Sequence, residues 1–312
     1  VDTVSVARDL DVLRALSGNE RLDYLGASYG TYLGAYYAEL FPANTGRMVL
    51  DGALDPSLSH YERRRGQAQG FERALRNYVD WCQAGQDCPL TGGTDAGVQQ
   101  VRDLIASADQ SPLPTSDPNR PVNGTEIRAA VMYSLYGDEQ TWGDLSSSLD
   151  EAVNRHGGSL FRRTTDQTVA DVVSTAAARE AITCLDYPVD GDMAVWSARH
   201  QEIRREAPAF GGMAASVDLS CQAWGHNGTR GPTPIHAQGA SPVLVVGSTG
   251  DPATPYQWAR SLAEQLDSGR LLTREGNGHT AYGRSVACTE AVDSYLLTGE
   301  LPEPEQVCQD QK

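Results

Sequence analysis

The residues best suited to chemistry lie in a Gly-x-Ser-x-Gly run, Gly26-Ala27-Ser28-Tyr29-Gly30. In this pattern the serine sits on a strained turn, and the glycines leave room for the neighbouring strand and helix. A short apolar run from Leu22 to Ala27 precedes the serine, and a helical stretch from Thr31 to Phe41 follows it. This order of strand, turn and helix predicts a nucleophile elbow with Ser28 as the nucleophile, in preference to a plain glycine-rich turn.

A serine nucleophile needs a general base and a carboxylate that orients the base. In chains with such an elbow the order is Ser, then Asp or Glu, then His. Asp251 follows the strongest apolar run, Pro242 to Gly247, and His279 follows another, Arg270 to Thr273. Both residues therefore follow expected strands, at the sheet edge where open α/β sheets bind their ligands. We predict Asp251 as the acid and His279 as the base.

Asp51 is the competing acid, because it also ends an expected strand, Arg47 to Gly52. We prefer Asp251 and expect Asp51 to be a structural turn residue. The remaining histidines lie in or beside a helical segment, and we expect them to be surface or packing residues: His60, His156, His200, His226 and His236.

The elements that must position these residues are those of an α/β protein. Before the elbow, Val6, Leu10, Leu13 and Leu16 recur at helical spacing, with Thr3 able to cap the helix. After Asp251 the pattern predicts a helix, a strand and a closing helix, at residues 256–266, 270–273 and 281–297. Continuous apolar strands of this kind are typical of a parallel sheet covered on both faces.

The middle of the chain differs, because helical periodicity recurs there and no strong strand is found. We therefore predict three parts: a first sheet segment at 1–54 with the elbow, a helical cap at 55–238, and a second sheet segment at 239–312 with the acid and base.

Composition narrows the function classes. The 312 residues carry a formal net charge of −16, which argues against nucleic-acid binding, because that binding depends on clustered cations. No apolar run reaches the roughly 18 residues that a membrane helix needs. We expect no membrane span, no metal and no cofactor.

The six cysteines form an even set, which favours disulfides, although sequence alone leaves the connectivity open. We favour sequence neighbours: Cys82 with Cys88, Cys184 with Cys221, and Cys288 with Cys308. A zinc site is the rival interpretation, but no Cys-x-x-Cys pair occurs. Disulfides imply a secreted or cell-envelope location. The opening VDTVSVARDL lacks a charged and apolar leader, so we expect this start to differ from the translated one.

Several motifs together resemble the secreted actinobacterial tripeptidyl aminopeptidases, which are α/β-hydrolase serine exopeptidases related to prolyl aminopeptidase. The motifs are Gly26 to Thr31, Asp51 to Pro56, Ala181 to Asp186, Gly250 to Pro255, and Gly278-His279. The resemblance implies an α/β-hydrolase sheet with a helical cap, a triad of Ser28, Asp251 and His279, and removal of short peptides from free amino termini. It also implies that Thr254 helps to position the acid or base.

Other roles follow from the mechanism. The backbone N–H of Tyr29 is the expected oxyanion donor after the nucleophile. An aminopeptidase must also bind the substrate ammonium, and Glu180 and Asp186 are our candidates for that contact, although solvated helix charges are an alternative for each.

The sequence departs from the family ahead of the elbow, where only one helix precedes Ser28 and no Gly-rich loop supplies the second oxyanion donor. We therefore expect the native enzyme to include a further amino-terminal segment ahead of Val1, because loss of one donor lowers rates by about 10² to 10³. The competing hypotheses are an esterase or lipase with the same triad, and a catalytically silent fragment.

Overall fold

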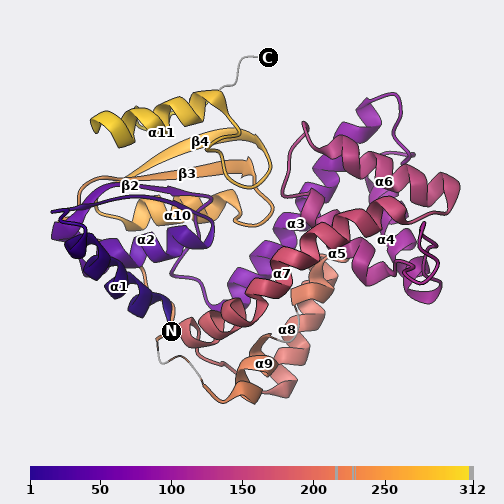
Figure 1. Cartoon of the computed structure of the whole chain (residues 1–312), viewed down its shortest axis with the longest axis horizontal. Coiled ribbons are helices and arrows are strands. Elements are labelled where there is room, and N and C mark those ends of the chain that lie inside the picture. Colours follow the sequence, from indigo (N-terminus) through magenta and orange to yellow (C-terminus); the bar gives the residue numbers. More distant parts are fainter. Residues whose placement is uncertain (215–216, 227, 229, 309–312) are drawn as a thin grey trace.

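The computed structural model describes residues 1–214, 217–226, 228 and 230–308. Its centre is a sheet of five parallel strands in the order β1-β2-β3-β4-β5, so that neighbours in the sheet follow one another along the chain (Figure 1). The strands are β1 (Leu22–Ala27), β2 (Thr45–Asp51), β3 (Val243–Gly250), β4 (Gly269–Asn277) and β5 (Val307–Cys308). Because all run the same way, their carboxyl ends meet at one edge.

Helices cover both faces of the sheet, which explains the continuous apolar strands. Met48 and Val245 point to the face covered by α1 (Thr3–Leu16), α2 (Tyr29–Leu40) and α10 (Tyr256–Gln265). Val49 and Leu244 alternate with them and point to the opposite face, against α11 (Val286–Thr298). Figure 1 shows α11 on one side of the sheet and α2 and α10 on the other. The short helix η1 (Pro42–Asn44) leads into β2.

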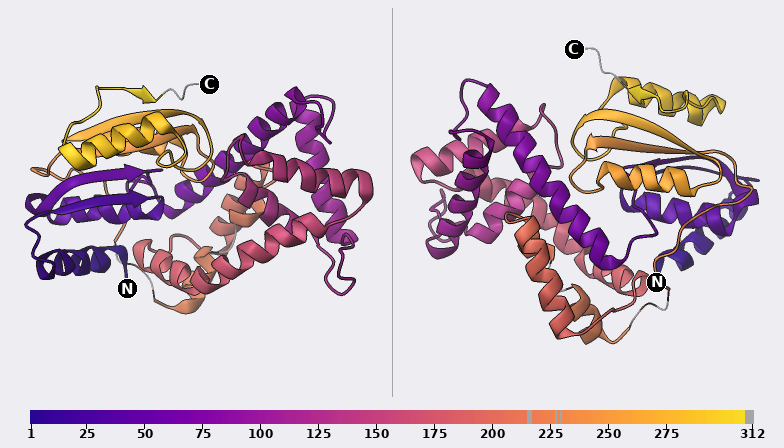
Figure 2. Two further views of the ribbon diagram at one scale, coloured as in Figure 1. Left: turned by 45° about the horizontal axis from the view of Figure 1, so that its top comes forward. Right: turned by 180° about the vertical axis from the view of Figure 1, so that it is seen from behind.

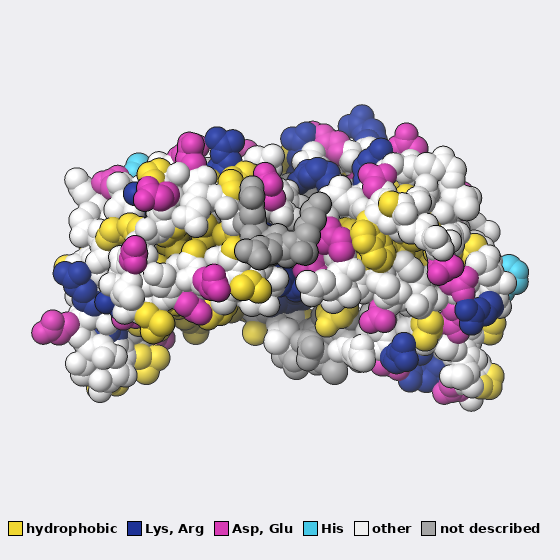
Figure 3. Space-filling view, turned by 90° about the horizontal axis from the view of Figure 1, so that it is seen from above, with side chains coloured by type: hydrophobic (Ala, Val, Ile, Leu, Met, Phe, Trp, Pro, Cys, Tyr) yellow, Lys and Arg dark blue, Asp and Glu magenta, His cyan; other side chains and the backbone are white. Residues whose placement is uncertain are grey.

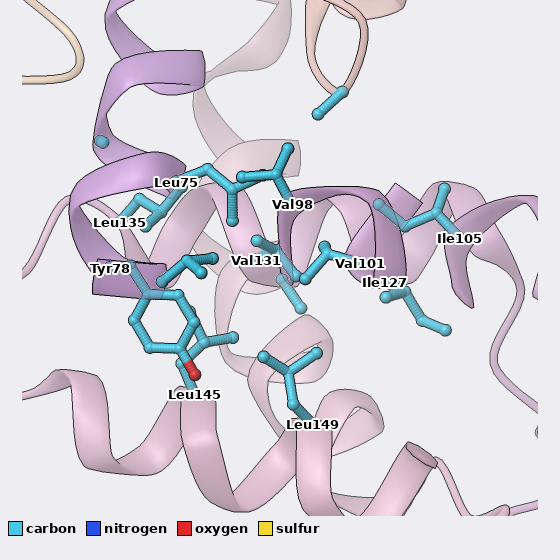
Figure 4. Packing of buried hydrophobic residues seen from close by; sticks show 14 of the residues in the cluster. Leu75, Tyr78, Val98, Val101, Ile105, Ile127, Val131, Leu135, Leu145 and Leu149 are labelled. Atoms are coloured by element: carbon cyan, nitrogen blue, oxygen red, sulfur yellow. The ribbon is translucent and has the colours of Figure 1, made fainter. Parts of the chain in front are cut away.

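Between β2 and β3 the chain forms a separate helical body beside the sheet, which we call the cap (Figure 2). Its helices are α3 (His60–Ala84), α4 (Thr94–Gln110), α5 (Gly124–Ser134), α6 (Trp142–Arg155), α7 (Ser159–Asp186), α8 (Met193–Glu206), η2 (Gly211–Ala214) and α9 (Val217–Trp224). The cap has its own apolar core, in which Leu75 and Tyr78 of α3 pack with Val101, Ile127 and Leu149 (Figure 4). The α/β-hydrolase fold with a large helical insertion is therefore observed.

The three predicted disulfides are confirmed. Cys82–Cys88 closes the end of α3, Cys184–Cys221 joins α7 to α9, and Cys288–Cys308 joins α11 to β5. Since every cysteine is paired, none is available as a zinc ligand. No helix in the described residues is long and apolar enough to cross a membrane. On the face shown in Figure 3, acidic and basic side chains are interspersed.

Some predicted boundaries were wrong by a few residues. Asp2 rather than Thr3 caps α1, because its carboxylate accepts from Ser5 N at 2.6 Å. The last helix begins at Val286 rather than Ala281, since Ser285 caps it. Apolar side chains are exposed on two neighbouring elements: Leu13 and Leu16 of α1 are 58% and 79% exposed, and Leu25 of the edge strand β1 is 41% exposed.

Candidate active site

Ser28 lies on a sharp turn between β1 and α2, where its backbone adopts φ 55° and ψ −120°. This conformation is strained for a residue with a side chain. Crowding explains the glycines: a Cβ at Gly26 would lie 2.5 Å from the carbonyl oxygen of Gly30. Ser28 N donates to Asp51 O at 2.9 Å, which ties the turn to β2. The local sequence thus builds the strained elbow that it predicts.

Asp251 follows β3 directly and is 3% exposed. Its two oxygens lie 3.0 and 2.9 Å from Nδ1 of His279, which donates to the carboxylate. The backbone also holds the carboxylate, because it accepts from the N–H groups of Ala253, Thr254 and Thr280 at 2.9, 2.8 and 3.1 Å. The acid is therefore fixed in place and pairs with one ring nitrogen of the histidine.

His279 lies on the loop after β4 and is 9% exposed. Its other ring nitrogen, Nε2, is buried and has no hydrogen-bond partner among the described residues. The hydroxyl of Ser28 is thus not hydrogen-bonded to it in this conformation. Hydrogen bonds between a nucleophile and its base are often long without substrate and tighten when substrate binds. Nε2 is left free to accept a proton.

Asp51 lies beside this pair but has a different role. It is 1% exposed, and its carboxylate accepts from Ala281 N at 3.0 Å and Tyr282 N at 2.8 Å. Burial, with a smaller effect of the negative charge on Asp251, raises the pKa of Asp51. Because it bonds the backbone just after His279, Asp51 anchors the histidine loop, as expected of a structural residue.

Thr254 touches both members of the pair. Its N–H donates to Asp251 and its Oγ1 lies 3.3 Å from Nδ1 of His279. Gly52, at φ 66°, keeps the space beside them open, because a Cβ there would lie 3.1 Å from Cε1 of His279. The position of Thr254 is therefore compatible with its predicted role.

Neither candidate for the substrate ammonium bonds Asp251 or His279 in the part of the chain that the structure describes. Both oxygens of Asp186 accept from Thr3, at 2.7 Å from its N–H and 2.5 Å from its hydroxyl. The same hydroxyl lies 2.5 Å from that of Tyr29. Glu180 is exposed on α7. The structure thus engages Asp186 at the start of α1 and does not bring Glu180 into contact with the Asp251–His279 pair.

Sequence reasoning missed the part of the cap that contacts the histidine loop. Tyr136 O accepts from His279 N at 3.0 Å, and the Tyr136 ring packs edge-on to the imidazole with centroids 5.4 Å apart. Asp138 pairs with Arg274 at 3.2 Å, and both side chains are almost fully buried. No local pattern could have found these residues, because they meet the loop only when the cap docks on the sheet.

The acid loop is held from the cap side as well. Gln67 of α3 donates to Ala253 O at 3.0 Å. Gly70, one turn further along, allows the helix to approach closely, because a Cβ there would lie 2.3 Å from Pro252 O. The loop that carries Asp251 and the loop that carries His279 are therefore both in direct contact with the cap.

Comparison with known proteins agrees with this geometry. A family profile described as "TAP-like protein" matches residues 207–308, which include Asp251 and His279. "Serine protease Hip1" of Mycobacterium tuberculosis is 34% identical over 97% of this chain, and "Tripeptidyl aminopeptidase" of Streptomyces lividans is 31% identical over 98%. The chain is similar to the tripeptidyl aminopeptidases. "Carboxylesterase B" of M. tuberculosis is 37% identical over 97% of the chain.

The similarity to the tripeptidyl aminopeptidases confirms the resemblance seen in the motifs. The chain spans only part of the length of these three relatives, namely 60%, 58% and 59%. Their names also differ, since two describe peptidases and one describes an esterase. The names support a serine hydrolase. They do not distinguish a peptide substrate from an ester substrate.

Proposed function

We propose that this chain is a serine hydrolase in which Ser28 is the nucleophile, His279 the general base and Asp251 the carboxylate that orients the base. One observation carries the proposal: the buried contact of Asp251 with Nδ1 of His279 leaves Nε2 without a partner among the described residues. That nitrogen is the atom that a base uses to accept the serine proton. The strained elbow at Ser28 and the names of the relatives support the assignment.

In the proposed reaction the hydroxyl of Ser28 attacks the substrate carbonyl while Nε2 of His279 takes its proton. His279 then returns the proton to the leaving group, and an acyl-enzyme remains on Ser28. Water, activated by the same histidine, releases the acyl group. Asp251 keeps the proton on Nδ1, so that Nε2 is the basic nitrogen, and Thr254 helps to hold both partners.

The negative charge on the carbonyl oxygen needs hydrogen-bond donors. Tyr29 N is the proposed first donor, because it lies in the first turn of α2, where N–H groups have no acceptor within the helix. We assign the second donor to residues that precede Val1 in the complete protein. The extra length of the relatives and the exposed side chains on β1 and α1 support this partner segment.

As substrate we propose peptides with a free amino terminus, from which the enzyme removes two or three residues. The names of the Streptomyces relatives support this choice. Glu180 remains a candidate for the ammonium, and Asp186 is the other, with both of its oxygens already accepting one hydrogen bond from Thr3. Ester hydrolysis is the second candidate, because the 37% identical relative is named a carboxylesterase. The disulfides favour a secreted or envelope location.

Paired reporters test the peptidase proposal. We expect the complete protein to hydrolyse a tripeptide coumarin amide with a free amino terminus at least tenfold faster than its acetylated form, because a buried ammonium contact is lost on acetylation. Fluorescence gives kcat/KM for both reporters. The Ser28→Ala variant is the control and should hydrolyse neither.

Equal rates on free and acetylated reporters would contradict the aminopeptidase proposal. Fast hydrolysis of a matched ester together with no amide hydrolysis would favour the esterase candidate instead.

A further inference from the structure

The end of α7 in the cap bonds the start of α1, and the two lie side by side in Figure 1. Asp186 is the last residue of α7, and its two oxygens accept from Thr3, at 2.7 Å from the backbone N–H and 2.5 Å from the hydroxyl. Thr3 is fully buried and is the first residue of α1, where backbone N–H groups have no acceptor within the helix. The carboxylate of Asp186 supplies that acceptor from the cap.

The hydroxyl of Thr3 connects Asp186 to the residue after the proposed nucleophile. Thr3 Oγ1 lies 2.5 Å from the hydroxyl of Tyr29. A threonine hydroxyl has one proton, and here that proton is donated to Asp186. The Tyr29 hydroxyl is therefore the donor in the other bond. This fixes the order of the chain of hydrogen bonds: Tyr29 donates to Thr3, and Thr3 donates to Asp186.

A second contact, one turn further along α2, holds the cap against the same helix. Tyr187 follows Asp186 directly and is buried. Its ring stacks on that of Tyr32 of α2, with centroids 6.0 Å apart. Tyr29 and Tyr32 are three residues apart and therefore lie on the same side of the helix. Two consecutive cap residues thus hold the start of the helix that follows Ser28, one through a bridging hydroxyl and one directly.

The position of Tyr29 is important because its backbone N–H is the proposed oxyanion donor. That N–H belongs to the peptide group between Ser28 and Tyr29, whose orientation depends on ψ of Ser28 and φ of Tyr29. Ser28 is strained, at φ 55° and ψ −120°, so this peptide group needs support from its surroundings. An oxyanion donor is effective when it is oriented before the charge develops. A side chain held at its hydroxyl restricts rotation about φ of Tyr29.

We propose that Asp186 is a positioning residue, which acts through Thr3 and Tyr29 to orient the oxyanion donor. A carboxylate suits this role, because hydrogen bonds to a charged acceptor are stronger than those between neutral groups. The proposal rests on the proposed hydrolase function and adds a role for the cap, which then supports the elbow as well as the loops of the acid and base. A positioning residue affects every substrate alike, whereas an ammonium contact affects only substrates with a free amino terminus.

Replacement of the bridging hydroxyl tests the chain of hydrogen bonds in the complete protein. Thr3→Val removes the hydroxyl at nearly constant volume and should lower kcat about tenfold with KM little changed, as loss of one charge-assisted hydrogen bond would give. Thr3→Ser keeps the hydroxyl and should retain most of kcat. Thr165→Val is the control, because it removes another buried hydroxyl near the opposite end of α7, and it should leave kcat of the folded protein unchanged.

A double variant tests whether the two hydroxyls act through one link. Tyr29→Phe removes the other hydroxyl of the chain, keeps the backbone donor, and should lower kcat by a similar factor. Thr3→Val combined with Tyr29→Phe should lose no more than the larger single loss, because both changes break the same bond. An unchanged kcat in Thr3→Val, or losses that multiply in the double variant, would overturn the proposal.

Asp186→Asn separates positioning from an ammonium contact. The amide keeps one acceptor and turns a donor toward the other group of Thr3, so one of the two bonds is lost. Positioning predicts the same severalfold loss of kcat/KM on the free and the acetylated tripeptide reporters. A loss confined to the free reporter would show that Asp186 binds the ammonium instead, which contradicts the positioning role.

A measurement without substrate separates failure of this proposal from failure of the hydrolase function. In protein carrying ¹⁵N-labelled tyrosine, the amide signal of Tyr29 is the one that disappears in Tyr29→Phe. We expect a sharp, slowly exchanging signal in the wild-type protein and in Thr165→Val, and a broadened, faster-exchanging one in Thr3→Val. That change supports the positioning of the amide even if the wild-type protein hydrolyses nothing. An equally sharp and slowly exchanging signal in Thr3→Val contradicts it, whatever the rate of hydrolysis.

Discussion

Two buried aspartates hold His279 and the loop that follows it, and they bond different groups. Asp251 contacts the imidazole through Nδ1, whereas Asp51 contacts only the backbone of the two residues after Thr280. The carboxylate of Asp251 can therefore act on the protonation of the ring. The carboxylate of Asp51 can act only on the position of the loop.

Asp251→Asn should lower kcat by about 10⁴, because an amide in this place favours the imidazole tautomer whose Nε2 carries the proton. KM should change little, since Asp251 is buried and does not face substrate. Steady-state kinetics on the best reporter would measure both constants.

Asp51→Asn is the matched comparison. It should lower kcat by roughly tenfold, because the amide retains one acceptor for the loop N–H groups and the Asp251–His279 contact persists. If Asp51→Asn were the more damaging change, the assignment of the acid would be wrong.

For single residues, the sequence predicted the positions that depend on a local pattern. Ser28, Asp251 and His279 each follow an apolar run, so their place at the carboxyl ends of parallel strands could be read from spacing. The contact of Asp186 with Thr3 could not, because it joins residues 183 positions apart and depends on how the cap meets α1.

The segment between α5 and α6 clamps the loop that carries the histidine. Tyr136 bonds the backbone of His279, Asp138 pairs with Arg274, and Asn277 donates to Glu139 at 2.6 Å. A Cβ at Gly278 would lie 3.0 Å from Gly137 O, so the two segments are in close contact. The cap therefore helps to set the position of the base.

Asp138→Asn should destabilise the protein by about 3–5 kcal/mol, because it leaves the buried charge of Arg274 without a counter-charge. It should also lower kcat, since the loop between Arg274 and His279 loses an anchor. Urea unfolding and kinetics would measure the two effects.

Asp150→Asn provides the control, because it breaks a more exposed ion pair with Arg155 on α6. It should change neither stability nor kcat appreciably. A loss of stability in Asp138→Asn with full kcat in the folded fraction would mean that the clamp holds the cap without positioning the base.

Periodicity predicted which segments form helices and strands more reliably than it predicted what packs against them. The strands and helices of the sheet segments were found close to their observed bounds, because apolar runs and 3.6-residue periodicity are local signals. The apolar pattern of α1 predicted the helix, and two of its residues, Leu13 and Leu16, are exposed. Periodicity marks an apolar face and does not say what covers it.

For the whole molecule, the sheet and the cap meet at the loops that carry Asp251 and His279. The sheet carries Ser28, Asp251 and His279 at its carboxyl edge, and the cap contributes Tyr136, whose ring packs on His279. Sequence patterns indicated the α/β class and the helical insertion. They could not indicate the contact between the two, because docking depends on residues more than a hundred positions apart, such as Asp138 and Arg274.

Ser28 is the residue that we propose as the activated nucleophile. The most direct test treats the complete protein with a fluorophosphonate and maps the adduct by mass spectrometry. We expect one adduct, on Ser28, that forms more slowly by orders of magnitude in Asp251→Asn and is absent from Ser28→Ala. An unlabelled wild-type protein, or labelling that persists in Ser28→Ala, would contradict it.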